Sequence, residues 1–257
     1  MIKLREPDIK KIKAMIRHRV WKLMEEKNIA TFPRPVFHRI PNFVGAEIAA
    51  KNLAKLDVFR KASVIKVNPD APQKPVRYLA LTMGKSVVVP TPRLRHGFIL
   101  LDPNTIPSSK YSEAATIHGA FKYGKIVKPW DLPSIDLVVV GSVAVNMQGA
   151  RLGKGEGFAE LEYAILRTLC KVTRDTPVVT TVHDIQIVNE PIPVEEHDVC
   201  VDIIVTPTKV HYVTPRPPKP SGILWNKIPQ ERISEMPVLS EVKKFLESNK
   251  AYVCYSS

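Results

Sequence analysis

Residues 149–158 combine closely spaced glycines with two basic side chains, a combination that suits a site for phosphate groups. The segment lies between a predicted buried strand and a predicted helix, and three of its glycines alternate with other residues: Gly153, Gly155 and Gly157. Glycines at such positions let the backbone turn tightly and approach a ligand closely. The following helix would direct free N–H groups and its positive end at the same place. Because Arg151 and Lys154 could neutralise phosphate oxygens, the segment predicts a polyphosphate site.

Better-known phosphate loops do not describe this segment. It lacks the terminal G-K-[ST] of a Walker loop and does not follow the Rossmann spacing G-x-G-x-x-G. An ordinary glycine-rich turn without a ligand is the alternative interpretation. Nucleophile-elbow, zinc-protease and Cys-x-x-Cys patterns do not occur in the sequence. For His183 we favour a structural role over chemistry with Asp184, because neighbours on a strand point to opposite faces.

Strand-like and helix-like stretches alternate along most of the chain. Short β-branched runs predict strands at 63–67, 86–90, 98–101, 137–140, 177–181, 185–188 and 199–205. Amphipathic or alanine-rich stretches predict helices at 9–27, 45–62, 76–83, 112–118, 158–170 and 238–246. This alternation favours an α/β fold with a mainly parallel sheet covered by helices on both faces. The glycine-rich loop should lie beyond the carboxyl end of the strand at 137–140, where ligands of open sheets bind.

The composition changes near residue 207. Residues 214–220 are rich in proline and basic side chains, which favours an extended segment. We therefore expect one α/β domain at 1–207 and a proline-rich extended tail at 208–257, with a short helix that packs on the domain. The 257 residues, of which 44% are hydrophobic, are enough for a substantial core.

The chain is strongly basic. Its 38 basic and 25 acidic residues give a formal charge of +13, which would attract anions such as a nucleotide, a polyglutamylated cofactor or RNA. A solvated lysine-rich surface is the alternative. We expect a cytoplasmic protein without a membrane span, because residues 1–13 carry five basic side chains and no apolar run typical of a secretory signal. The three widely spaced cysteines are expected to be buried free thiols: Cys170, Cys200 and Cys254.

The loop and a later block resemble the 5-formyltetrahydrofolate cyclo-ligase (5,10-methenyltetrahydrofolate synthetase) family. Its members carry G-x-R-L-G-x-G-x-G-Y-Y-D-R after a strand, and residues 149–157 match the first nine positions without a gap. The family's P-x-E-x-H-D…D…T block resembles residues 193–198 followed by Asp202 and Thr206. Gln186 stands where the family has a glutamine before this block. The order of the two blocks is also that of the family.

Further matches come from the first helix and three short segments. Lys13 and Arg17 repeat the family's K-x-x-x-R spacing, and one helical turn makes them point the same way. Residues 39–43, 68–73 and 90–94 look like a divergent branch, the methenyltetrahydrofolate-synthetase-domain-containing proteins. The resemblance covers roughly residues 9 to 210. It implies a three-layer α/β/α arrangement related to sugar-phosphate isomerases and CoA transferases.

The resemblance also implies a reaction, with ATP and Mg²⁺ as cofactors and a folate-like small molecule as substrate. In the family, ATP phosphorylates the formyl oxygen of 5-formyltetrahydrofolate, the neighbouring folate nitrogen attacks, and loss of phosphate leaves 5,10-methenyltetrahydrofolate. The implied ATP-binding residues are Lys13, Arg17, Arg151, Gly153, Lys154, Gly155 and Gly157. The other implied roles are catalysis by Arg151 and Lys154, substrate binding by Asp70 and Gln73, and metal binding by Glu160 and Asp198.

The substrate side departs from the family pattern more than the phosphate side does. Where the family has Y-Y-D-R, residues 158–161 are Phe-Ala-Glu-Leu. Asp70 replaces a glutamate and Gln73 a threonine, so the reach of both polar groups changes. Asn146 stands for an aspartate and Pro207 for a glutamate. A changed acyl substrate, weak cyclo-ligase activity and loss of catalysis are all compatible with these changes.

Two other functions therefore stay open. One is a non-catalytic ATP- or RNA-binding member of the same fold, which the positive charge would suit. The other is an ATP-dependent enzyme of another cofactor pathway. RNA is not the favoured partner, and no RNP-type aromatic motif occurs in the sequence. The protein would be a monomer or a homodimer.

Overall fold

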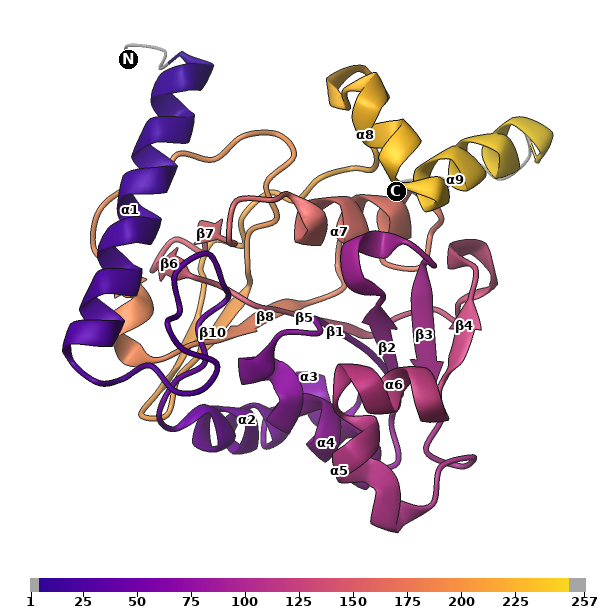
Figure 1. Ribbon diagram of the computed structural model, residues 1–257, viewed down its shortest axis with the longest axis horizontal. Coiled ribbons are helices and arrows are strands. Elements are labelled where there is room, and N and C mark those ends of the chain that lie inside the picture. The colour runs from indigo at the N-terminus through magenta and orange to yellow at the C-terminus, as the bar shows by residue number, and fades with distance from the viewer. Residues whose placement is uncertain (1–4, 250–257) are drawn as a thin grey trace.

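A computed structural model describes residues 5–249, and within that range one sheet has eight strands (Figure 1). They are β1 (Val64–Val67), β2 (Ser86–Pro90), β3 (Phe98–Leu101), β4 (Lys125–Val127), β5 (Leu137–Val140), β8 (Val178–Thr181), β10 (Ile203–Val205) and β11 (Val210–Tyr212). Their order is β11-β10-β8-β5-β1-β2-β3-β4. The central strands from β10 to β2 are parallel, whereas β11, β3 and β4 join antiparallel at the edges. The predicted α/β fold with a mainly parallel sheet is confirmed.

Helices cover both faces of this sheet (Figure 1). One layer contains α2 (Ala46–Ala54), α3 (Asp57–Arg60), α4 (Lys74–Thr82), α5 (Tyr111–Ala114) and α6 (Ile117–Tyr123). The opposite layer contains α7 (Phe158–Thr168), α8 (Gln230–Glu235) and α9 (Pro237–Ser248). Strand β5 serves both cores: Leu137 and Val139 face the first layer, and Val138 and Val140 face the second. This alternation is typical of a strand buried on both sides.

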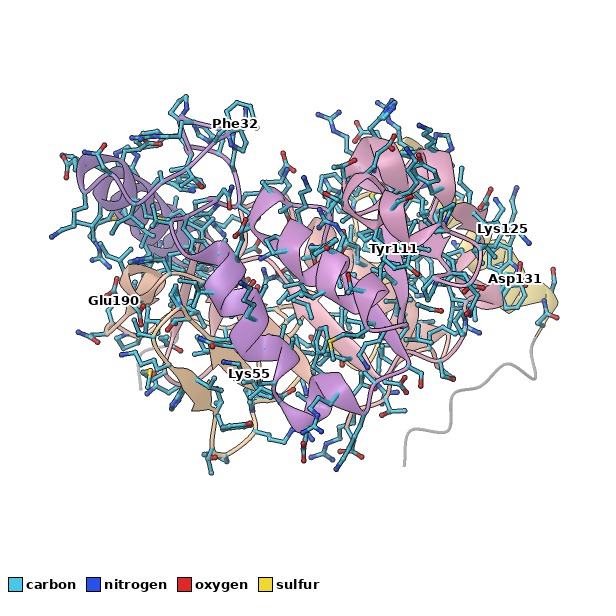
Figure 2. The ribbon with its side chains drawn as sticks, turned by 90° about the horizontal axis from the view of Figure 1, so that it is seen from below. Phe32, Lys55, Tyr111, Lys125, Asp131 and Glu190 are labelled. Carbon is cyan, nitrogen blue, oxygen red and sulfur yellow. The ribbon has the colours of Figure 1, made fainter. Side chains whose placement is uncertain are left out.

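The first layer is seen from below in Figure 2, where Lys55 follows α2 and Tyr111 begins α5. Two helices predicted as single units are divided here. The helix predicted at 45–62 forms α2 and α3, and the one predicted at 112–118 forms α5 and α6. The second break has a local cause, because the Thr116 hydroxyl accepts a hydrogen bond of 2.9 Å from the Gly119 amide and so caps the start of α6.

Helix α1 (Glu6–Glu26) stands at one end of the molecule beside a second, small sheet (Figure 1). This sheet has the order β7-β6-β9, with β6 (Ala144–Asn146), β7 (Arg151–Leu152) and β9 (Ile187–Val188). Apolar residues of α1, including Ile16 and Val20, pack in one cluster with Ala144 and Leu152. The strand predicted at 185–188 is therefore wrong in its extent: residues 184–186 form a 3₁₀ turn, and only 187–188 form a strand.

The residues after 207 add to the main sheet and to its core. Strand β11 pairs with β10, and Met236, Leu239 and Val242 are buried in the same cluster as the apolar residues of α7. The helix predicted at 238–246 is present as α9. The segment between β11 and α8 is attached by a buried ion pair, in which Lys219 Nζ lies 2.7 Å from Asp202 Oδ2. Helix α9 thus packs in the same hydrophobic core as α7.

The cysteines differ in state, so the expectation of free thiols is only partly right. Cys200 is a buried free thiol, and burial raises its pKa to about 11. Cys170 is disulfide-bonded, which corrects the prediction for this residue. Cys254 lies outside the described residues. Among residues 5–249, no helix has the length and apolar character needed to cross a membrane.

Candidate functional site

A cleft of about 880 Å³ opens beyond the carboxyl ends of β1 and β5. Its walls come from α1, the glycine-rich loop at 153–157, the start of α7 and the loop at 195–198. Every predicted site residue except Gln73 lines it: Lys13, Arg17, Asp70, Arg151, Gly153, Lys154, Gly155, Gly157, Glu160 and Asp198. The strand order explains the position, because parallel strands present their following loops at one edge of the sheet.

The glycine-rich loop has the backbone conformation that its composition predicts. Gly155 has φ +104° and Gly157 has φ +73°, both in the left-handed region that favours glycine. Gly157 is also the N-cap residue of α7, so the free N–H groups of the first turn open toward the cleft. Such a terminus offers hydrogen bonds and a positive potential to an anion.

Arg17 lies directly over this loop. Its Nε donates a hydrogen bond of 2.7 Å to the carbonyl oxygen of Gly153. Within the described residues, its two terminal nitrogens have no hydrogen-bond partner, so they are available to a ligand. Burial is the main effect on its pKa and lowers it, while Glu160 acts in the opposite direction. An arginine nevertheless stays cationic at neutral pH.

Lys154 is a basic residue of the loop itself, and it is held only weakly. Its Nζ lies 2.8 Å from Glu156 Oε2, and both side chains are partly exposed. A pair of this kind contributes little to stability, so a phosphate group could draw Lys154 away from Glu156 at small cost.

Arg151 is placed differently from what the sequence suggests. Its side chain is fully buried in the cleft wall, where it forms an ion pair with Glu160. Its Nη1 donates to the carbonyl oxygen of Gly141 at 2.8 Å, and its Nε donates to that of Val199 at 3.1 Å. These bonds engage every nitrogen of the guanidinium. The geometry therefore favours a positioning role for Arg151, which ties three segments of the cleft together.

The predicted metal ligands, Glu160 and Asp198, both line the cleft but have different partners. Glu160 is held by Arg151, whereas Asp198 lies in another group of three side chains. Among the described residues, the ligand atoms of Glu195, His197 and Asp198 lie within 4.8 Å of one another. Carboxylate oxygens are suitable for Mg²⁺, and two of the three residues offer them.

Lys13 forms ion pairs with both carboxylates of that group. Its Nζ lies 2.8 Å from Glu195 Oε2 and 2.5 Å from Asp198 Oδ2, and its side chain is buried. The ammonium group thus neutralises charge on both carboxylates and connects α1 to the loop at 195–198. A phosphate group would have to compete with these two carboxylates for Lys13.

Asp70 lies on the floor of the cleft beside Gly141, where its Oδ2 is 3.2 Å from the point that a Cβ on this glycine would occupy. No donor from another described residue reaches its carboxylate, which makes it a free acceptor for a ligand. Burial, the largest effect, raises its pKa, and Lys154 is the strongest opposing influence. The Asp70 carboxylate could therefore accept hydrogen bonds from N–H groups of a heterocyclic ligand.

Gln73 lies beneath the cleft rather than in its wall. It is fully buried, and its Nε2 donates to Thr181 Oγ1 at 3.2 Å. Its Oε1 has no hydrogen-bond partner in the described part of the chain. A Cβ on Gly141 would come within 2.9 Å of this oxygen, so only glycine fits there without a shift. Gln73 thus supports the floor at Gly141.

Sequence reasoning missed a buried charged pair under the floor. Lys66 of β1 forms an ion pair with Glu162 of α7 and donates a hydrogen bond of 2.8 Å to Asn68 Oδ1. Burial raises the pKa of Glu162, and Lys66 acts against this shift. Both Asn68 and Glu162 line the cleft. The available signal was a lysine within an otherwise apolar strand, since a buried charge needs a partner.

Sequence reasoning also missed Arg77, which holds the loop that carries Asp70. Arg77 of α4 is buried, and its Nε donates a hydrogen bond of 2.7 Å to the carbonyl oxygen of Ala115. It also donates to the carbonyl oxygen of Asn68, and burial lowers its pKa to about 10. The loop from β1 to α4 is therefore held in place by a charged hydrogen-bond donor below it.

Comparison with known proteins identifies the family to which the chain belongs. Residues 9–207 match the 5-formyltetrahydrofolate cyclo-ligase family. A methenyltetrahydrofolate synthase domain-containing protein of Bos taurus is 46% identical over 241 residues, which cover 93% of this chain and 63% of that relative. A 5-formyltetrahydrofolate cyclo-ligase of Mycolicibacterium smegmatis is 31% identical over 134 residues, or 50% of this chain and 63% of that one.

A 5,10-methenyltetrahydrofolate synthetase of Aquifex aeolicus, solved by NMR, has a TM-score of 0.49 and 20% identity, with 84% of this chain and all of that one covered. The chain spans less than two thirds of the length of the curated relatives named above. The family match, in contrast, includes most of the present chain and the whole glycine-rich loop. The chain belongs to the 5-formyltetrahydrofolate cyclo-ligase family.

Proposed function

We propose that the protein uses ATP to convert 5-formyltetrahydrofolate, or a related one-carbon compound, to 5,10-methenyltetrahydrofolate. One observation carries this proposal: a phosphate-type loop with Arg17 above it and the free carboxylate of Asp70 line the same cleft. The loop and Arg17 suit the triphosphate, and Asp70 suits the polar edge of a pterin-like ring. Two substrates could therefore meet between them.

The reaction transfers the γ-phosphoryl group to the formyl oxygen and then forms a ring. ADP leaves in the phosphoryl transfer. The neighbouring folate nitrogen N10, which lies outside the pterin ring, then attacks the formyl carbon and gives up its proton to the solvent, and the C–O bond breaks to release phosphate and leave the methenyl product. Negative charge spreads over phosphate oxygens in such a transfer. In this proposal Arg17, Lys154 and the N–H groups at the start of α7 stabilise that charge, and their position at the cleft supports this role.

Mg²⁺ would screen the charge of the phosphates when bound. Asp198 and Glu195 offer the carboxylate oxygens that this ion prefers, with Lys13 between them as a resident cation. Arg151 acts on the loop and not on the phosphates, because Glu160, Gly141 and Val199 already engage it. This division of roles leaves Arg17 and Lys154 as the residues that contact the transferred group.

The proposal can be tested by following the absorbance of the methenyl product. The assay contains the protein, ATP, Mg²⁺ and the (6S) isomer of 5-formyltetrahydrofolate. Arg17→Met should abolish the signal, and Lys11→Met is a matched control, because Lys11 is exposed on the same helix and outside the cleft. Absence of product above the reaction without protein would refute the folate substrate. Tight, salt-sensitive RNA binding without ATP binding would favour the non-catalytic RNA-binding alternative instead.

A further inference from the structure

A second cavity, of about 300 Å³, adjoins the cleft on the side of α7. Most of its wall is apolar: Leu161 and Ala164 of α7, and Ile223, Leu224 and Ile228 from the segment that follows residue 220. That segment lies beyond residue 207, where the match to the cyclo-ligase family ends. The cavity is therefore built jointly by the family domain and by residues that the family pattern does not include.

The C-terminal segment is fastened to the glycine-rich loop. The guanidinium of Arg232 lies 4.7 Å from the ring centroid of Phe158, and it donates a hydrogen bond to the carbonyl oxygen of Glu156. A cation over an aromatic face is an attractive arrangement. Phe158 takes the place of the first tyrosine in the family's Y-Y-D-R. The loop thus contacts the C-terminal segment at a position where it departs from the family pattern.

Two further contacts fix the same wall. Lys227 Nζ lies 2.7 Å from Glu196 Oε2, which connects the segment to the loop at 195–198. The amide of Ile223 donates a hydrogen bond of 2.9 Å to Thr168 Oγ1 at the end of α7. The cavity wall is consequently attached at both sides of the cleft and at the far end of α7.

The cavity and the cleft are neighbours that share part of their lining. Gly157, Glu160 and His197 line both of them. A ligand whose phosphates lie on the glycine-rich loop could therefore extend past Gly157 into the second cavity. The part that enters should be flat and largely apolar on its faces, because the wall offers few polar groups and binding pockets for such moieties are mainly hydrophobic.

We propose that this cavity receives the heterocyclic base of the nucleotide whose phosphates the loop binds. The inference rests on the proposed function. A purine presents two apolar faces to the walls while its polar edge can stay at the opening. A pterin suits the cavity less well, because the free carboxylate that it needs, Asp70, lies in the cleft and not here. Because apolar walls read shape rather than hydrogen-bonding groups, the site should discriminate poorly between purines.

Calorimetric titration with ATP and with inorganic tripolyphosphate tests the idea. Ala164→Phe fills the cavity from α7, and Ile228→Trp fills it from the opposite wall. Each should weaken ATP binding by about tenfold or more, since the base loses its apolar contacts, while tripolyphosphate affinity stays within about twofold of the parent value. Val44→Trp is the control, because Val44 is exposed and lies outside both cavities.

The possible outcomes separate the two proposals. If the parent binds ATP no more tightly than tripolyphosphate, or if both filled variants bind ATP like the parent, the base lies elsewhere and the nucleotide site itself stands. If the parent binds neither compound, the proposed function and this inference both fail. Thermal unfolding identifies a variant that does not fold, and the variant on the other wall then decides the question. GTP binding within about threefold of ATP binding would support the expected tolerance.

Discussion

The guanidinium of Arg17 lies against Gly155: its Cζ is 3.5 Å from the point that a Cβ on this glycine would occupy. The contact joins the first helix to the phosphate-type loop across 138 residues of sequence. It explains why Gly155 has two reasons to be glycine, its left-handed φ of +104° and the close approach of a cation. An anion on the loop would meet the N–H groups of α7 and Arg17 at the same time.

Replacing Gly155 by valine should abolish ATP binding and leave the fold in place. The added side chain would displace Arg17 and strain the backbone, so we expect no heat of binding above that of dilution in a titration with a non-hydrolysable ATP analogue. Gly84→Val is the matched control. Gly84 also has a left-handed φ, +71°, but it lies outside the cleft and nothing approaches its side-chain position within 4 Å. Equal loss of binding in both variants would show that backbone strain alone is responsible.

Removing the charge of Lys154 should weaken nucleotide binding by about 1.5–3 kcal/mol, the scale of a hydrogen bond to a charged group. Lys154→Met is measured by titration with ATP against the parent protein. Glu156→Gln should have the opposite effect, because the carboxylate that now holds Lys154 at 2.8 Å is lost. If Lys154→Met binds ATP as the parent does, this lysine does not contact phosphate.

Arg151 should matter mainly for stability. Arg151→Met leaves the Glu160 carboxylate without its partner in the cleft wall, and breaking a buried ion pair of this kind costs about 3–5 kcal/mol. Urea unfolding gives the free energy of unfolding directly. Arg174→Met, which changes an exposed arginine, should stay within about 0.5 kcal/mol of the parent. A small loss for Arg151→Met together with a large loss of ATP affinity would return Arg151 to the role of phosphate ligand.

The raised pKa of Asp70 predicts a pH-dependent stability. Between the ordinary pKa of an aspartate and the raised value in the fold, the native protein binds more protons than the unfolded chain, so this residue makes stability fall as pH rises through that window. Asp70→Asn removes the contribution. The variant should therefore gain stability relative to the parent at neutral pH, and the gain should shrink toward about pH 4. Urea unfolding at several pH values measures the difference, and a gain independent of pH would contradict the assignment.

Much of the fold was predictable from local patterns. The strands at 86–90, 98–101 and 137–140 have the predicted bounds, because compact β-branched or apolar runs between turns leave few alternatives. The small sheet was not foreseen as a separate unit. Its strands β7 and β9 are two residues long, too short to produce a periodic pattern. Leu152 and Val188 of these strands pack in one cluster with α1, and no local pattern specifies this tertiary contact.

In the site, too, local features were predictable from the sequence and contacts between distant residues were not. Spacing and composition place Gly155, Gly157 and Lys154 at the cleft, since each acts through its own backbone or side chain. Pairing between distant residues could not be read in this way. Lys66 and Glu162 are 96 positions apart, and nothing local specifies that one neutralises the other. The contact of Arg232 with the loop is equally non-local, and it lies beyond the family pattern.

The central claim is that ATP phosphorylates the formyl oxygen, and the most direct measurement follows that oxygen. The protein is incubated with ATP, Mg²⁺ and 5-formyltetrahydrofolate that carries ¹⁸O in the formyl group, and the released phosphate is analysed by mass spectrometry. The account predicts one ¹⁸O atom in each phosphate formed with the methenyl product, because the C–O bond breaks after phosphoryl transfer. Phosphate without the label, or no phosphate beyond the reaction without protein, would contradict it.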